Sequence, residues 1–356
     1  MTLRLATGGE SHGPSLVGIL SGLPAGLELD RDAIDADLAR RQQGYGRSPR
    51  QKLEQDRIEV IAGLRHGRTL GTPFAFLVRN RDHANWEWGM SPWPPEGEPS
   101  GKGTKPVTLP RPGHADLAGS LKYGLDDARN ALERASARQT AVTVAAGSVA
   151  KALLEQIGVA IVGSVVAMGN VDEAKADRDT VGGVVEVRAR GVSPGLGSYA
   201  SKEDRLDARL ASALMGIQGV KGVEVGDGFA LAGERGSAAH DEIFRDDRGY
   251  YRETNRAGGL EGGVSNGEEI VVRAAMKPLP TLMRPLRSAD LETGEPAEAL
   301  VERSDVAAVE ALSVVAEASV AFELARAARE KFGGDAIGDF VAAHGAYLER
   351  IPWSAR

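Results

Sequence analysis

The sequence predicts an α+β protein in which long helices lie between two sheets. Two alanine-rich segments, at 127–157 and about 305–331, have the composition of helices that are apolar on every side, and such helices belong in a core. Strand patterns precede and separate them with no break in composition, so we expect one domain over residues 1–356. Helices buried on all sides are best covered by sheets on both faces.

Composition and charge narrow the classes of function. The chain has 356 residues, a formal net charge of −7 and no cysteine. The negative charge disfavours binding to nucleic acid or anionic lipid, and the lack of cysteine excludes disulfides and thiol nucleophiles. Polar residues 10–12 interrupt the N-terminal segment too early for a signal sequence, and no run of about eighteen apolar residues is present. We expect a cytoplasmic protein that does not span a membrane.

The first third of the chain is predicted to hold short strands and one helix. The strand patterns lie at 3–7, 15–23, 58–62 and 72–78. Asp30 is a typical N-cap for a helix that runs to about Arg41. Residues 80–112 have no periodicity and are rich in tryptophan and proline. A loop of this length is usually functional, so we interpret it as a lid or an inter-subunit arm, with disorder as the alternative.

The rest of the chain is predicted to contain the two core helices, a further helix and more strands. These further elements are strands at 160–168, 182–190, 228–233 and 268–276 and a helix at 202–218. Ser304 or Asp305 can cap the last core helix, and Gly333 and Gly334 can end it.

The turn after the first strand reads GGESHG (8–13). Its glycines allow backbone N–H groups to approach a ligand closely. A histidine changes charge near neutral pH, so one held beside a phosphate can protonate that phosphate as it leaves. For this motif alone, a plain polar turn is an equally good interpretation.

Two other segments carry cations or a second histidine. Residues 40–52 read RRQQGYGRSPRQK, with five cations and no acid. Guanidinium groups pair bidentately with phosphate and carboxylate, although such a run is also typical of a solvated loop. Residues 111–116 read RPGHAD, in which His114 and Asp116 have a spacing that also occurs in metal sites. A histidine paired with a neighbouring carboxylate is the commoner case.

Arginines and small residues precede each core helix. Arg134 and Arg138 share a face if the helix already runs there, and an ion pair is the alternative role. Residues 277–281 read KPLPT, where prolines stiffen a loop that presents a lysine and a threonine to an anion. Residues 303–305 open the last core helix, whose N-terminal dipole favours an anion, although Asp305 can simply be the cap.

Taken in order, these segments resemble the chorismate synthase family along essentially the whole chain. The matching segments are GESHG (9–13), RRQQGYGR (40–47), RPGHAD (111–116), RASARQTA (134–141), AGGLEGGVSNG (257–267), KPLPT (277–281) and RSD (303–305). Each is a weak signal alone, but seven in register are very specific. The resemblance implies a β–α–β sandwich with mainly antiparallel sheets and a homotetramer.

The resemblance also implies a lyase of aromatic amino acid biosynthesis. The family converts 5-enolpyruvylshikimate 3-phosphate to chorismate by 1,4-elimination of phosphate. It requires reduced FMN although there is no net redox change, and NADPH is the candidate reductant. No metal is implied. Whether this chain reduces its own flavin does not follow from the sequence.

By position, the resemblance assigns roles to residues of this chain. Acid–base roles fall on His12, His114 and Asp305. The expected FMN contacts are Arg134, Ala135, Ser136, Gln218, Gly219, Gly262, Lys277, Pro278, Leu279, Pro280, Thr281 and Arg303. The residues expected at NADPH or the substrate phosphate are Arg41 and Arg47, and those expected at the substrate are Ser11, Arg40 and Arg138. The family has serine at Ala135 and glutamate at Gln139, so the second serine contact to flavin is not expected here.

The residue types suit this chemistry independently. The substrate carries two carboxylates and a phosphate, and FMN adds another phosphate, so a site for both needs many arginines. Early loss of phosphate leaves an allylic cation, which an electron-rich flavin can stabilise. We hypothesise that His12 protonates the departing phosphate, that His114 maintains the proton balance of the flavin, and that Asp305 helps to relay the proton taken up by flavin N5.

A metal-dependent phosphohydrolase is the main alternative from another class. It would use His12, His114, Asp116 and Asp305 and would be inactivated by a chelator, but it leaves the arginine-rich, small-residue segment unexplained. A nucleic-acid-binding module would rest on residues 40–52 alone. The acidity of the chain and the lack of an aromatic platform beside that run disfavour it.

Overall fold

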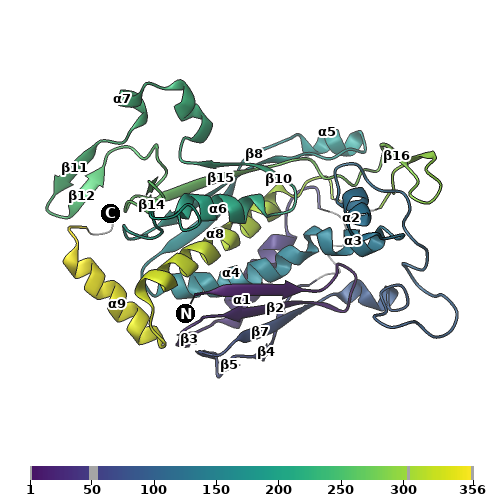
Figure 1. The fold of residues 1–356 in the computed structure, drawn as a ribbon, viewed down its shortest axis with the longest axis horizontal. Coiled ribbons are helices and arrows are strands. Elements are labelled where there is room, and N and C mark those ends of the chain that lie inside the picture. Colours follow the sequence, from purple (N-terminus) through teal and green to yellow (C-terminus); the bar gives the residue numbers. More distant parts are fainter. Residues whose placement is uncertain (1, 48–54, 303–304, 354–356) are drawn as a thin grey trace.

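A layer of helices lies between two four-stranded antiparallel sheets (Figure 1). The computed structural model describes residues 2–47, 55–302 and 305–353. The first sheet has the order β1 (Arg4–Gly8), β2 (Ser15–Ser21), β7 (Phe74–Arg79) and β4 (Ile58–Ala62). The second has the order β10 (Val220–Val225), β15 (Ile270–Met276), β9 (Gly183–Arg190) and β8 (Ala160–Met168).

Smaller sheets of two or three strands accompany the two large sheets. One has the order β3 (Ala25–Glu28), β6 (Arg68–Leu70) and β5 (Leu64–Arg65). The two-stranded pairs are β11 (Ile243–Asp246) with β12 (Gly249–Arg252), β13 (Leu260–Glu261) with β14 (Val264–Ser265), and β16 (Arg287–Ala289) with β17 (Pro296–Glu298).

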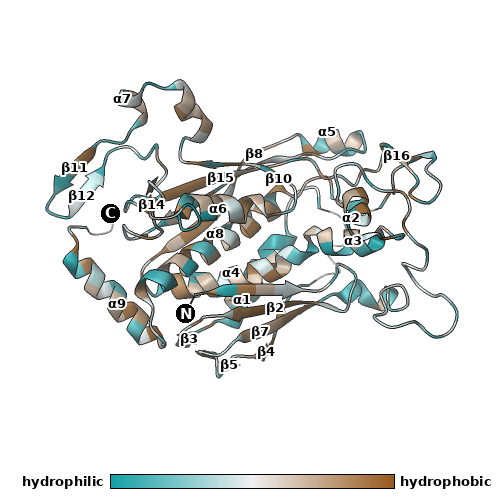
Figure 2. Cartoon of the chain, in the orientation of Figure 1, coloured by the Kyte–Doolittle hydropathy of each residue, from teal (hydrophilic) through white to brown (hydrophobic). Residues whose placement is uncertain are grey.

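The helical layer is built from α1 (Arg31–Gln42), α4 (Thr140–Glu155) and α8 (Val309–Phe332). α4 packs on β2 and β7, whereas α8 packs on β8 and β9, so each core helix faces a different sheet. Figure 2 shows apolar residues gathered where helices and sheets face each other. The remaining helices are α2 (Asp116–Tyr123), α3 (Arg129–Ala135), α5 (Val171–Ala176), α6 (Leu206–Met215), α7 (Gly236–Ala239) and α9 (Ile337–Arg350), with 3₁₀ turns η2 (Arg81–Asn85), η3 (Ala137–Gln139) and η4 (Gly228–Gly233). The predicted sandwich is confirmed.

Small residues let the layers approach closely. A methyl group at Gly147 of α4 would overlap with the Cβ of Ala318 in α8, and one at Gly163 of β8 would overlap with a backbone oxygen of α8. Ion pairs also link the helices of this layer: Glu317 of α8 accepts from Arg40 of α1 (2.9 Å) and from Lys151 of α4 (2.8 Å). The helical layer therefore combines tight alanine and glycine contacts with an ion network centred on the buried Glu317.

Most predicted elements are confirmed, and several boundaries are those expected. Asp30 caps α1 by accepting from the backbone N–H of Asp32 (2.9 Å), and α8 ends at Gly333 with φ +62°. The helix predicted at 202–218 is shorter, running only over α6. Among the described residues, no helix combines the length and apolar character of a membrane span.

The strand predicted at 228–233 is wrong, because that segment forms the 3₁₀ turn η4. The strand lies just before it, at β10, and Gly226 and Gly228 then adopt positive φ and turn the chain away. Glu224 accepts from the backbone N–H of Phe229 (3.2 Å), whose side chain is 79% exposed. A short apolar run between glycines therefore resembles a buried strand although it lies at the surface.

Both long helices begin later than predicted. The helix expected over 127–157 is interrupted at Ser136, which has extended backbone (φ −63°, ψ 142°) and accepts from the N–H of Arg138 (3.3 Å). α8 begins at Val309, so Asp305 is not its cap, and Ser304 lies outside the described residues. Arg138 therefore lies in the 3₁₀ turn η3 and Asp305 lies before α8, so neither belongs to a long helix.

We predict that Gly147→Ala destabilises the protein by about 1–3 kcal/mol, because the added methyl group forces α4 and α8 apart. Urea unfolding at pH 7 measures the change. Gly345→Ala in α9 is the matched control, since a methyl group there meets nothing within 4 Å. It should be neutral or stabilising by about 0.5–1 kcal/mol. Equal effects of the two substitutions would contradict the proposed close packing.

Candidate active site

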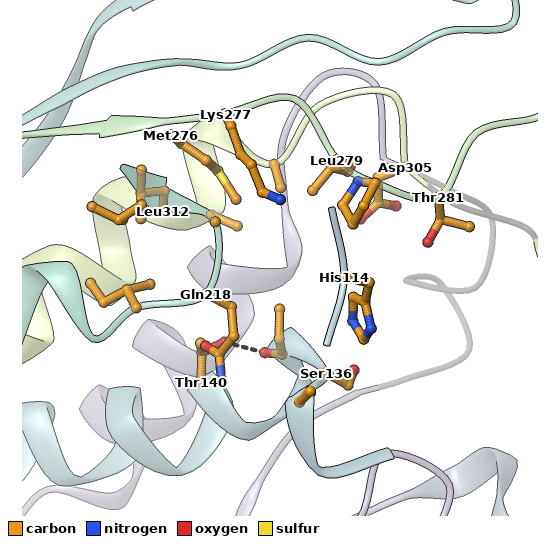
Figure 3. Close-up of a pocket in the computed structure, with 18 of the residues that line it drawn as sticks. His114, Ser136, Thr140, Gln218, Met276, Lys277, Leu279, Thr281, Asp305 and Leu312 are labelled. Carbon is orange, nitrogen blue, oxygen red and sulfur yellow. Dashed lines mark hydrogen bonds between the residues drawn. The ribbon is translucent and has the colours of Figure 1, made fainter. Parts of the chain in front are cut away.

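A cavity of about 520 Å³ opens at one end of the helical layer (Figure 3). The first turns of α4 and α8 line it, and so do the segment that follows β15 and the turn before β10. Two long helices thus begin at the same cavity, where their dipoles favour an anion. Its volume lies within the usual range for small-molecule sites, about 300–1,000 Å³.

The cavity is strongly cationic although the chain is acidic. Its lining cations are Arg41, Arg47, Arg111, Arg138, Lys221 and Lys277. Among the described residues that line it, Asp305 is the one acidic side chain. A local excess of positive charge in a walled cavity concentrates anionic ligands.

A buried carboxylate behind the wall holds two of the arginines. Asp56 Oδ2 accepts from Arg41 Nη2 (2.7 Å) and from Arg138 Nη1 (2.6 Å), and its side chain is fully buried. Burial alone raises the pKa of Asp56, but the two guanidinium groups outweigh it and hold this pKa below its usual range. One carboxylate therefore serves two cations and leaves the pair with an excess of positive charge.

Asp305 forms an ion pair with Arg47 (2.7 Å) at the cavity wall. Burial lowers the pKa of Arg47, and Asp305 opposes this change. The Nε atoms of Arg47 and Arg41 are buried and have no hydrogen-bond partner within the described residues. Unsatisfied buried donors beside a cavity indicate a site for an anionic ligand.

His114 faces the cavity, and its Nδ1 contacts Asp116 Oδ1. The same carboxylate accepts from Arg111 Nε (2.8 Å) and from the Arg111 backbone (3.0 Å). Burial alone raises the pKa of Asp116, but the hydrogen bonds and charges of His114 and Arg111 hold this pKa well below its usual range. An ionised partner on Nδ1 leaves Nε2 as the ring nitrogen that can exchange a proton with a ligand.

The imidazole of His12 lies outside the cavity lining, one residue from Ser11, which does line it. Its Nδ1 is 2.7 Å from Glu133 Oε1, and its ring stacks on Trp86 with centroids 3.9 Å apart. Ser136 Oγ donates to Ser11 Oγ (3.2 Å), which ties this turn to the cavity wall. The two histidines therefore have the same kind of carboxylate partner in different surroundings.

The segments expected to contact flavin meet at the cavity. The backbone N–H of Lys277 donates to Gly219 O (3.0 Å), and the ammonium group of Lys277 contacts Gly113 O. Gly219 has φ +87°, which lets the backbone approach a ligand closely. The apolar wall residues are Met215, Ile217, Met276, Leu279, Leu312 and Val315. Apolar walls and convergent cations suit a flat ring system that carries a phosphate, so the residues present fit FMN.

The structure gathers most of the predicted site residues. Those that line the cavity are Ser11, Arg41, Arg47, His114, Ala135, Ser136, Arg138, Gln218, Gly219, Lys277, Pro278, Leu279, Pro280, Thr281 and Asp305. Arg134 instead lines a neighbouring cavity of about 310 Å³, because the break at Ser136 turns it away from Arg138. Arg40 is exposed and binds the buried Glu317 outside both cavities, and Gly262 lies in the β13–β14 hairpin, which lines neither cavity. Arg303 is outside the described residues.

Comparison with known proteins identifies the family. A family model for chorismate synthase matches residues 3–177 and 167–328. A chorismate synthase from Desulforudis audaxviator is 52% identical over 98% of both chains, and one from Rubrobacter xylanophilus is 50% identical over the whole of this chain. A solved structure entitled "Crystal Structure of Chorismate Synthase" matches with a TM-score of 0.79 and 36% identity over 99% of both chains. The chain belongs to the chorismate synthase family.

Membership in the chorismate synthase family removes the main support for a phosphohydrolase. That alternative needs His12, His114, Asp116 and Asp305 to converge on one ion. Instead, His12 binds Glu133, His114 binds Asp116 and Asp305 binds Arg47. Among the described residues, no three histidine or carboxylate side chains come together as a metal site.

Four charged residues in or beside this site were not among the residues expected from the sequence. Arg111 and Lys221 line the cavity, while Asp56 and Glu133 orient groups beside it. Arg111 belongs to the RPGHAD motif, which contains the signal that could have identified it. No local pattern marks Asp56 or Glu133, because their partners are brought to them only by folding.

We predict that Asp116→Asn destabilises the protein by about 2–4 kcal/mol at pH 7, since it removes a buried charge partner of Arg111 and His114. A carboxyl with a lowered pKa contributes stability above its unfolded pKa of about 4 and loses it as the pH falls. The difference from wild type should therefore shrink below about pH 4. Urea unfolding between pH 7 and pH 3 measures it, with the exposed Glu253→Gln as control. A difference that is constant with pH would contradict the assignment.

Proposed function

We propose that the protein catalyses the 1,4-elimination of phosphate from 5-enolpyruvylshikimate 3-phosphate to give chorismate, and that it requires reduced FMN. The observation that carries this proposal is the cavity itself, in a chain of this family, where six cationic side chains from separated segments surround an apolar hollow. A substrate with two carboxylates and a phosphate, bound beside a flavin phosphate, needs such a charge excess.

Anion binding is the first role of the cavity residues. The pairing of Arg41 and Arg138 through Asp56 supports their role as a fixed pair of guanidinium donors for the substrate. The buried Nε of Arg47 supports a phosphate contact. That phosphate belongs to the substrate or to NADPH, and only a comparison of the two ligands separates these cases.

The flavin would be held by Ala135, Ser136, Gln218, Gly219 and residues 277–281. When bound, reduced FMN supplies electron density that stabilises the electron-poor ring of the substrate as phosphate departs. The chain contributes a wall of aliphatic and methionine side chains that excludes water, which strengthens the electrostatic interactions inside the cavity.

The proton transfers fall to three residues in this proposal. His114, with Asp116 on Nδ1, holds its exchangeable proton at Nε2 beside the flavin segment. Asp305, held by Arg47, receives and passes on the proton removed from the substrate carbon. His12, next to the wall residue Ser11, protonates the departing phosphate. From the family alone, we also propose that the protein is cytoplasmic and forms a homotetramer. Analytical ultracentrifugation tests the oligomeric state.

Anaerobic turnover tests the proposed function. We predict that the protein, with FMN reduced by dithionite, converts 5-enolpyruvylshikimate 3-phosphate to equal amounts of phosphate and chorismate, measured by phosphate assay and by absorbance. A chelator should leave the rate unchanged. Replacing dithionite by NADPH shows whether the protein reduces its own flavin. Phosphate release without chorismate, or inactivation by the chelator, would contradict the proposal.

We predict that His114→Ala lowers kcat by about 10²–10⁴-fold when reduced FMN is supplied, because a positioned acid–base group is lost. His240 is exposed and does not line the cavity, so His240→Ala is the matched control and should keep the wild-type rate. Steady-state assays at several substrate concentrations separate kcat from KM. A near wild-type kcat for His114→Ala would exclude this role.

A further inference from the structure

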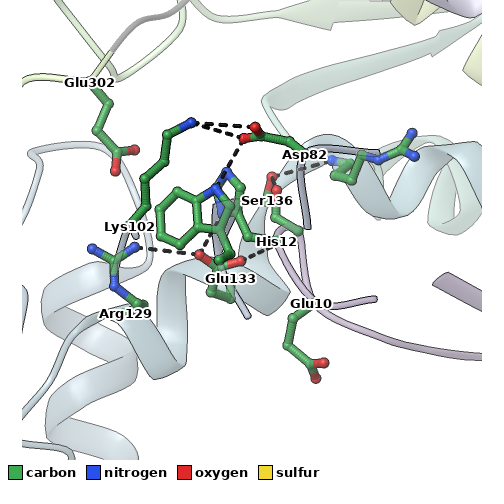
Figure 4. A network of polar contacts seen from close by, with 12 residues as sticks. Glu10, His12, Asp82, Lys102, Arg129, Glu133, Ser136 and Glu302 are labelled. Carbon is green, nitrogen blue, oxygen red and sulfur yellow. Dashed lines mark hydrogen bonds and ion pairs between the residues drawn. The ribbon is translucent and has the colours of Figure 1, made fainter. Parts of the chain in front are cut away.

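The long segment that follows β7 contacts His12 in two ways. His83 Nδ1 lies 2.9 Å from the backbone oxygen of His12, and Trp86 covers the imidazole ring. Trp86, which is only 7% exposed, stacks on the imidazole with an angle of 21° between the rings. Figure 4 shows the polar contacts around His12, with Glu133 beside it. In the same segment, Trp93 is 79% exposed. The two tryptophans therefore differ in burial, and Trp86 is the one that contacts the histidine.

Trp86 is itself fixed from several sides. Its Nε1 donates to Asp82 (3.0 Å), which also binds Lys102 (3.2 Å), and the guanidinium of Arg129 lies over its ring at 5.0 Å. A methyl group at Gly103 would approach this ring to 2.9 Å, so the later part of the loop packs tightly against the indole. Both limbs of the loop thus hold the indole in place.

Glu133 makes two different bonds to His12. Its Oε1 lies 2.7 Å from the ring Nδ1, and its Oε2 accepts from the His12 backbone N–H (2.8 Å). The Glu133 side chain is only 1% exposed. Because a carboxylate only accepts, Nδ1 must carry one hydrogen, and Nε2 carries the lone pair of the neutral ring. The ring takes up a second proton at Nε2 and passes that proton on to the departing phosphate.

We propose that Glu133 and Trp86 are positioning residues for His12: Glu133 fixes the tautomer and Trp86 fixes the plane of the ring. The long loop is then the element that delivers Trp86. This inference rests on the proposed function, since it assigns the support for its phosphate-protonating histidine. His114 also has a carboxylate on its Nδ1, that of Asp116, although Arg111 Nη2 contacts this nitrogen as well (3.2 Å). In both histidines Nε2 is the ring nitrogen without a carboxylate partner.

The chemistry of an amide makes Glu133→Gln a sharp test. His12 offers two hydrogens to Glu133, one from the backbone and one from the ring, and a glutamine has a single acceptor oxygen. The backbone N–H can only donate, so the amide oxygen must stay with it. The amide NH₂ then faces Nδ1 and requires that nitrogen to accept. The variant should therefore switch His12 to the tautomer with hydrogen on Nε2.

The experiment combines ring ¹⁵N spectra with kinetics. Histidine-labelled protein is studied by long-range ¹H–¹⁵N NMR, and the His12 signals are assigned by their loss in His12→Asn. We expect the Nδ1–H tautomer in wild type, Nε2–H in Glu133→Gln, and a fall in kcat of about 10²-fold with little change in KM. The fall in kcat for Glu133→Gln cannot exceed the fall for His12→Ala. Unchanged tautomer and unchanged kcat in Glu133→Gln would overturn the proposal.

The loop is tested separately, so that a folding defect in Glu133→Gln does not decide the outcome. Trp86→Leu should lower kcat and broaden or shift the His12 ring signals, Trp86→Phe should restore most of both, and Trp93→Leu should match wild type. Equal behaviour of Trp86→Leu and Trp93→Leu would overturn the role of Trp86. If wild type itself forms no chorismate, the proposed function fails, and the spectra still decide whether Glu133 and Trp86 set the tautomer and ring environment.

Discussion

The close contact between α4 and α8 is the constraint on which the rest of the structure depends. Gly147 has no side chain, so α4 can approach Ala318 of α8 closely and the two helices lie in one layer. Each helix then packs on a different sheet. Both helices begin at the same end of that layer. The fold therefore creates one place where two helix N-termini converge, and the cavity occupies it.

The cavity concentrates positive charge in a chain that is acidic overall. Cations contributed by α1, by the segments before α4 and by the segment after β15 face one hollow. Fewer carboxylates accompany them. Asp56, Asp116 and Glu302 lie outside the cavity lining and pair with arginines, and Asp305 pairs with Arg47 at the cavity wall. The carboxylates fix the directions of the guanidinium groups while leaving an excess of positive charge, which is what a polyanionic substrate and a phosphate-bearing cofactor require.

Sequence reasoning reached the frame of the fold and most of the site, and its failures have physical causes. Strands such as β4 and β8 and the cap at Asp30 follow from local patterns, and they are as predicted. The break at Ser136 is set by one hydrogen bond and by packing, so an alanine-rich pattern could not reveal it. Arg40 was expected at the substrate because it belongs to a basic run, yet its partner Glu317 is 277 residues away. Long-range pairs of this kind decide which cations face the cavity.

The central claim is that the cations of this cavity bind phosphate-bearing ligands. The most direct measurement compares the affinity of oxidised FMN with that of riboflavin, which lacks only the phosphate, by calorimetry at low and high salt. Charge-assisted hydrogen bonds of about 1.5–3 kcal/mol predict that FMN binds about 10–100-fold more tightly and that the advantage falls as salt is raised. Equal affinities at every salt concentration would contradict the account.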